Sequence, residues 1–120
     1  MFRYGIEHEI ALLRADGRFA DASNTGFDEH QAVVDALPED PADYPGLRIG
    51  DVGIKHKRWY VEGYERFDED GALVRCDPKG LEIRTRIHDA VAAAVAALRA
   101  DQALLDAELG PRGLRTLSLI

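Results

Sequence analysis

The run from His88 to Leu109 constrains the fold more than any other part of the chain. It is rich in alanine and lacks glycine and proline, and it is followed by Gly110-Pro111, a pair that ends helices. Its larger apolar side chains recur at helical spacing on one stripe, formed by Val91, Val95, Leu98, Leu105 and Leu109. We therefore predict a long amphipathic helix whose stripe is buried against another layer of secondary structure.

The chain before this helix begins with the alternation typical of a β-strand. In residues 2–14 the side chains of Ile6, His8 and Ile10 share one face, which is expected to face the core. His8 is accordingly interpreted as a buried core histidine before it is considered as a ligand. Asp16-Gly17 then predicts a tight turn into a short returning strand.

A second group of strands is predicted in the middle of the chain. Residues 55–67 are rich in aromatic side chains and are interpreted as one long strand. Asp70-Gly71 predicts a hairpin turn into a strand over residues 72–76. The segment Asp77-Pro78-Lys79-Gly80 predicts a further turn into a short strand over residues 81–86. Together these strands form an antiparallel meander.

Three further segments complete the predicted fold. Residues 28–37 have the apolar spacing and the acidic start of a short helix, and residues 38–46 contain three of the five prolines, which suits an exposed connector. Residues 114–120 predict a final strand. We expect one α+β domain over residues 1–120, with two helices packed on one face of a mostly antiparallel sheet.

The charge and the cysteine content argue against several classes of function. Among 120 residues, 22 are acidic and 15 are basic, and the resulting charge of -7 disfavours nucleic acid or an anionic membrane as a partner. A cationic ligand or a metal fits better. No apolar run approaches the roughly 20 residues of a membrane span, and no signal segment is recognised after Met1. Because Cys76 is the single cysteine, we expect a cytoplasmic protein.

Glu7 and Glu9 are the first candidate site residues. Residues i and i+2 of a strand project from the same face about 6–7 Å apart, so both carboxylates would stand beside Gly5, which adds no bulk. Carboxylate oxygens suit Mg²⁺ or Mn²⁺, whose coordination is usually completed by water and by substrate phosphates. The alternative is that the two acids are simply solvated on the wet face of an edge strand.

Glu82 strengthens the case for a metal. It stands between Leu81 and Ile83, which are predicted to face the core, and it shares the opposite face with Arg84. If this strand lies near the first, three carboxylates converge, and like charges on one sheet face repel one another unless a cation neutralises them. Arg84 offers a fork for a phosphate or a carboxylate, or is itself the neutralising cation.

The aromatic strand and its flank supply the remaining candidates for nucleotide binding. Glu62 and Glu65 lie on opposite faces, and Glu62, which is flanked by tyrosines, is preferred for the same site. Trp59 or Tyr60 could stack on a ligand, although core packing is the more common role of such residues. Lys55 and the three basic residues after it could hold a nucleotide phosphate or form a solvated strand end.

The candidate residues carry a resemblance to a known family. Tyr4-Gly5-Ile6-Glu7-His8-Glu9-Ile10, then Gly80-Leu81-Glu82-Ile83-Arg84-Thr85 and a long alanine-rich helix resemble the N-terminal portion of carboxylate-amine ligases of the glutamate-cysteine ligase type, relatives of glutamine synthetase. The resemblance implies half of a glutamine synthetase-like catalytic fold with a curved antiparallel sheet. It also implies that Glu7, Glu9 and Glu82 bind the magnesium ions that hold ATP. Arg84 matches the form of the second motif seen in part of the family.

The resemblance implies a function as well as a fold. It suggests an ATP- and Mg²⁺-dependent ligase that joins a small-molecule carboxylate to an amine through an acyl phosphate. Known members are several times longer, so we expect a homo-oligomer, or a complex with a separate ligase-half protein, to complete the site. The alternative is a non-catalytic metal- or nucleotide-binding module or shortened ligase subunit that acts through a protein partner. A metal-dependent hydrolase would use the same acids but lacks an evident base.

Overall fold

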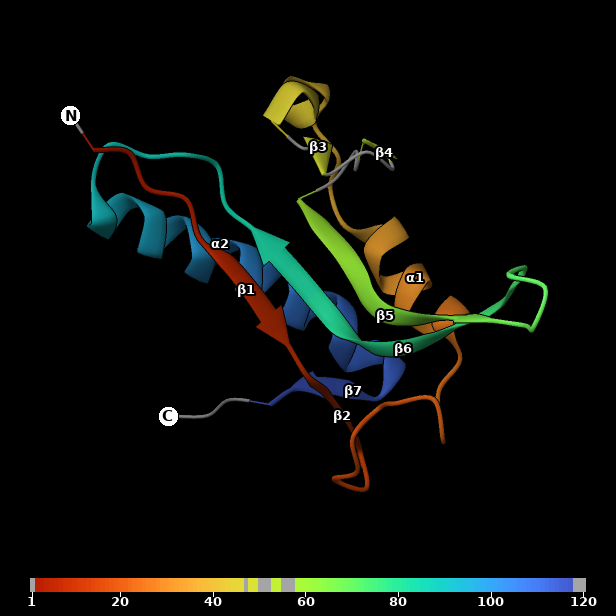
Figure 1. Ribbon diagram of the computed structural model, residues 1–120. Helices are drawn as coiled ribbons and strands as arrows, with labels where there is room; N and C mark the ends of the chain where they lie inside the picture. The colour runs from red at the N-terminus through yellow and green to blue at the C-terminus, as the bar shows by residue number, and fades with distance from the viewer. Residues whose placement is uncertain (1, 47, 50–52, 55–57, 118–120) are drawn as a thin grey trace.

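The computed structural model describes residues 2–46, 48–49, 53–54 and 58–117 (Figure 1). It belongs to the α+β class that the sequence predicts, with two α-helices and antiparallel sheets. In chain order its elements are β1 (Glu7–Ile10), β2 (Leu12–Arg14), α1 (Phe27–Ala36), the 3₁₀-helix η1 (Pro41–Gly46), β3 (Arg48–Ile49), β4 (Gly53–Ile54), β5 (Trp59–Phe67), β6 (Leu73–Arg84), α2 (Val91–Leu109), the 3₁₀-helix η2 (Gly110–Arg112) and β7 (Leu114–Thr116).

The main sheet has three antiparallel strands in the order β1-β6-β5. Two smaller sheets pair β2 with β7 and β3 with β4. The single strand predicted over residues 2–14 is therefore two strands, because the chain leaves β6 after Ile10 and pairs with β7 from Leu12 onward. The backbone N–H of Leu117 donates to the carbonyl of Ala11, the residue between the two strands, at 3.0 Å.

The turn predicted at residues 77–80 is wrong, because these residues continue β6. Pro78 lies opposite Gly63, while Gly80 lies opposite Glu62, so Lys79 is an extra residue that forms a β-bulge. Proline is tolerated in strands at bulges and edges, where no ladder bond from its nitrogen is needed. Both conditions hold here, because β1 ends before it reaches Pro78 and leaves β6 with one neighbouring strand.

Both helices pack against one face of the main sheet, as Figure 1 shows. The register places Leu81 and Ile83 of β6 on this face, where they are almost fully buried, as predicted. α1 supplies Val33 and Val34 to the same core, and α2 supplies its C-terminal apolar residues. Part of the core is thus formed by the side chains of Ile10, Val33, Val34, Trp59, Leu81, Ile83, Leu105 and Leu109.

Two packing predictions fail at the margins of this core. His8 pairs with Ile83 and so lies on the helix side of the sheet, but it is exposed, because β1 is an edge strand with one open flank. Val91, placed on the buried stripe, is 55% exposed at the first residue of α2. The helix buries Ala94 and Asp101 in addition to Leu105 and Leu109, so its covered stripe includes a charged residue.

A buried ion pair between Arg58 and Asp101 joins α2 to the start of β5. The two terminal nitrogens of the Arg58 guanidinium, Nη1 and Nη2, donate to the two carboxylate oxygens of Asp101 at 2.5 and 3.1 Å. Arg58 also donates to the carbonyl of Arg84 at 3.1 Å, and its Nε lies 3.4 Å from Asp43. The sequence places Arg58 in a basic cluster that would hold a nucleotide phosphate or form a solvated strand end, and the structure shows instead that it is a buried structural residue. Neither helix of the described residues is long and apolar enough to span a membrane.

Candidate functional site

The candidate site lies on the face of the main sheet that the helices leave open. Residues paired across neighbouring strands point to the same side of a sheet, so the register determines which side chains meet. On the open face these side chains form three adjacent rows, which are Glu7 and Arg84, then Glu9, Glu82 and Tyr60, then Gly80 and Glu62. The sequence predicted that Glu7, Glu9, Glu82 and Arg84 share one face, and the register confirms it.

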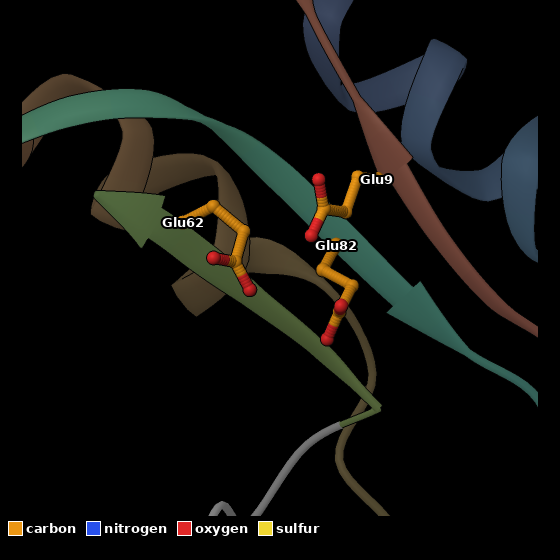
Figure 2. A group of neighbouring side chains, drawn as sticks. All are labelled: Glu9, Glu62 and Glu82. Carbon is orange, nitrogen blue, oxygen red and sulfur yellow. The ribbon is translucent and has the colours of Figure 1, made fainter. Parts of the chain in front are cut away.

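Glu9, Glu62 and Glu82 form a carboxylate cluster at the centre of this face. Each contributes an oxygen, and these oxygens all lie within 4.8 Å of one another. The three residues come from β1, β5 and β6 respectively, and Figure 2 shows their side chains gathered over the sheet. The preference for Glu62 over Glu65 therefore agrees with the geometry. Glu65 pairs with Cys76, away from the cluster.

Glu82 is the buried member of the carboxylate cluster. It is 5% exposed, whereas Glu9 is exposed and Glu62 is half-buried. Burial raises the pKa of Glu82, and the neighbouring charges of Glu7 and Glu9 raise it further, while the Arg84 guanidinium opposes them. An ionised carboxylate in this position is destabilising unless a cation compensates it.

Arg84 supplies part of that compensation. Its Nη2 lies 3.1 Å from Glu7 Oε1, its Nε lies 3.4 Å from Glu82 Oε2, and its guanidinium carbon is 5.2 Å from the centre of the Tyr60 ring. Glu7 is therefore held in an ion pair with Arg84, and the structure does not bring it into the carboxylate cluster. Arg84 is both near enough to orient an anionic ligand and already engaged as a neutralising cation, so both sequence interpretations of it retain support.

Gly80 allows the strands that carry the cluster to approach closely. A Cβ atom at this position would lie 2.3 Å from the carbonyl oxygen of Ile10, which is far closer than non-bonded atoms approach. A depression of about 230 Å³ opens beside Gly80, and its lining includes Glu9, Glu62 and Lys79. Lys79 Nζ lies 3.5 Å from Glu9 Oε2. Lys79 is not among the site residues predicted from the sequence, because residues 77–80 have the composition of a turn.

A larger depression of about 550 Å³ lies on the other side of the carboxylate cluster. Its lining includes Arg3, Glu7, Arg84 and Thr85. The Thr85 hydroxyl accepts a hydrogen bond from the backbone N–H of Ile6 at 2.9 Å, which ties the start of β1 to the end of β6. The open face thus has a depression on each side of the acids, one lined by Lys79 and one by two arginines.

The remaining predicted residues are placed as follows. Lys55 lies outside the described residues. Trp59 is 3% exposed and packs in the core, so it cannot stack on a ligand at the surface. Tyr60 is half-buried beneath Arg84. Asp77, the first residue of the predicted turn, pairs with Arg66 and Arg75, each at 2.9 Å.

Comparison of the chain with protein-family models, with curated proteins and with solved structures gives no significant match. The chemical argument therefore depends on the geometry of the open face. Three carboxylates from three strands, with one of them buried, form an oxygen donor set of the kind that Mg²⁺ and Mn²⁺ prefer.

Proposed function

We propose that the open face binds a divalent cation, Mg²⁺ or Mn²⁺, through Glu9, Glu62 and Glu82, and that this site holds the phosphates of ATP. The observation that carries the proposal is the burial of the Glu82 carboxylate within 4.8 Å of two other carboxylates. A buried charge costs several kcal/mol by order of magnitude unless it is paired, and Arg84, which lies 3.4 Å from Glu82, is shared with Glu7, so the Glu82 carboxylate is only partly compensated.

The charge of the carboxylates and of the cations paired with them favours a divalent ion. The acids Glu7, Glu9, Glu62 and Glu82 contribute -4 when ionised, and their ion-pair partners Arg84 and Lys79 contribute +2, so this group carries a net charge of -2. One divalent cation would balance it. Glu7 is a further candidate ligand, because it is the neighbour of Glu9 on the same face of β1 and its carboxylate is 63% exposed.

The activity proposed for this site is that of a carboxylate-amine ligase of the glutamate-cysteine type, on the half of a glutamine synthetase-like fold with a curved sheet. A substrate carboxylate attacks the γ-phosphorus of ATP and displaces ADP, and an amine then attacks the acyl carbon and displaces phosphate, which leaves an amide. A bound cation would neutralise phosphate charge in such a transfer. Arg84 would bind the anionic substrate, and the carboxylate cluster would orient the nucleotide.

The proposal includes an assembly and a location. The depression that Glu9 and Glu62 line, about 230 Å³, is smaller than the 300–1,000 Å³ typical of ligand pockets, and the lining of the larger one, about 550 Å³, includes no residue of the carboxylate cluster. A second copy of the chain, or a ligase-half protein, would enclose the substrates. ATP, Mg²⁺ and a free thiol at Cys76 suit a cytoplasmic protein. The same small volume favours a second candidate function, a non-catalytic Mg²⁺-nucleotide-binding module that acts through a protein partner.

Calorimetric titration of MgCl₂ and MnCl₂, and then of ATP with and without Mg²⁺, tests the site. We expect cation binding, Mg²⁺-dependent ATP binding, and loss of both in the Glu82→Gln variant. Glu65→Gln is the matched control, since it removes the same charge from an exposed acid of β5 that lies away from the cluster. A chain that binds neither cation would refute the proposal.

A screen for ADP release separates the two candidate functions. Mg²⁺-dependent ADP release that requires both a carboxylate and an amine would identify the ligase. If the assembled protein binds Mg²⁺-ATP but releases no ADP with any of a panel of amino acids, it is the binding module.

A further inference from the structure

Tyr64 is an exposed aromatic residue beside the carboxylate cluster that the proposed function does not use. It follows Glu62 by two residues on β5, so the two side chains project from the same face, about 7 Å apart along the strand. Its relative exposure is 51%, although it lies in the interior of a nine-residue strand. The ring is therefore presented to solvent on the ligand side of the sheet.

Two cations adjoin the Tyr64 ring. The guanidinium carbon of Arg66 lies 5.3 Å from the ring centre, and Lys79 Nζ lies 6.0 Å from it. Both distances are within the range of cation–π attraction, which orients the ring without burying it. An aromatic face with basic side chains around it is the combination that binds nucleobases next to phosphates.

Lys79 connects the ring to the carboxylate cluster. The same Nζ that lies 6.0 Å from the Tyr64 ring lies 3.5 Å from Glu9 Oε2. The β-bulge explains this reach, because Lys79 is the extra residue of β6 between the positions opposite Glu62 and Gly63. The cation therefore lies between the acids and the aromatic ring, where the phosphates of a nucleotide would pass.

We propose that the base of a nucleoside triphosphate stacks on Tyr64 and that Lys79 leaves Glu9 to bind its phosphates. The inference rests on the proposed function and gives the nucleotide a direction, with the phosphates at the carboxylate cluster and the base toward the Phe67 end of β5. Tyr64 is preferred to Tyr60 for this role, since Tyr60 is half-buried whereas Tyr64 is 51% exposed. Stacking is tolerant of base identity, so ATP and GTP should bind with similar affinity.

The test compares ATP with inorganic tripolyphosphate, both in the presence of Mg²⁺, by calorimetric titration. Tripolyphosphate has the phosphates but no base. Tyr64→Ala is expected to weaken ATP binding by about tenfold, as base stacking implies, and to leave tripolyphosphate binding unchanged. Tyr64→Phe keeps the aromatic face and should bind both ligands as the unaltered chain does. Lys79→Gln should weaken both.

Phe67→Ala is the matched control, because Phe67 is an aromatic residue of β5 with 57% exposure that lies three residues from Tyr64 and so projects from the other face. It should leave both affinities unchanged. Equal ATP affinity in Tyr64→Ala and the unaltered chain, with tripolyphosphate still bound, would overturn this inference alone. Failure of the unaltered chain to bind tripolyphosphate with Mg²⁺ would overturn the proposed function and this inference together. Circular dichroism and melting temperature verify that each variant is folded.

Discussion

The buried pair of Arg58 and Asp101 allows a quantitative prediction for Asp101→Asn. Asparagine keeps the shape of the side chain but removes its charge, and its NH₂ group faces a guanidinium that can only donate. The substitution loses one of two charge-assisted hydrogen bonds and leaves Arg58 buried with 10% of its side chain exposed. Breaking such a pair typically costs about 3–5 kcal/mol. We expect the lower end, about 3 kcal/mol, because Asp43 remains 3.4 Å from Arg58 Nε.

Urea unfolding followed by circular dichroism measures this cost. With an m value of about 1.5 kcal/mol/M, a loss of about 3 kcal/mol lowers the midpoint by about 2 M. Asp106→Asn is the control, since this exposed acid lies on the same helix, and it should change the midpoint by less than about 0.4 M. The double variant Arg58→Met/Asp101→Leu should recover most of the loss, because it leaves no unpaired charge in the core. An Asp101→Asn midpoint within experimental error of the unaltered chain would refute the reasoning.

Three further predictions concern the cluster and the core. Glu82→Gln should stabilise the metal-free chain at pH 7, because burial raises the pKa of Glu82 and its ionised form opposes folding. The gain in the free energy of unfolding should shrink toward pH 4, where the carboxyl is protonated. A loss of stability at pH 7 in urea unfolding would show that the ion pair with Arg84 dominates. Gly80→Ala should cost at least about 2 kcal/mol in the same assay, because its Cβ would meet the Ile10 carbonyl at 2.3 Å; an unchanged midpoint would mean that β1 moves freely. His30 is fully buried, and burial lowers its pKa below the ordinary 6.5, so the side chain is neutral in the folded chain. Its contribution to the free energy of unfolding is therefore present above pH 6.5 and is lost as the pH falls below that value. The urea midpoint should therefore decrease as the pH is lowered from 7.5 to 5.5, and the decrease should be smaller in the His30→Leu variant. An equal pH dependence in the two chains would assign the effect to other groups.

Local patterns in the sequence were enough to predict the part of the open face that carries Glu7, Glu9, Glu82 and Arg84. Leu81 and Ile83 are apolar neighbours of Glu82, and this alternation gave both the buried face of β6 and the position of its carboxylate. Glu7 and Glu9 were placed by the same rule. Helix α2 was predicted within three residues at its start and to the residue at its end, because its composition and its Gly-Pro terminus are local signals.

Other features depend on contacts between distant residues and have no local signal. Arg58 and Asp101 are 43 residues apart, and nothing near either one indicates the other. Residues 77–80 have strong turn chemistry, but pairing with β5 overrides it and the bulge accommodates the proline. His8 follows the pattern of a core residue, yet its exposure is decided by the position of β1 at the edge of the sheet.

The extra residue in β6 also limits how the length of the chain can vary. Gly80 lies opposite Glu62 and Pro78 lies opposite Gly63, so deletion of Lys79 would close the bulge and leave both pairings in register. Arg75 and Asp77 would keep the face on which their ion pair forms, whereas deletion of Leu81, in the regular part of the strand, would turn the side chains on one side of it to the opposite face. Single-residue deletions should therefore be tolerated in the hairpin between β5 and β6 and at Lys79, but not from Leu81 to Arg84. A library of single-residue deletions across β6 would reveal this as a sharp boundary in the yield of folded protein.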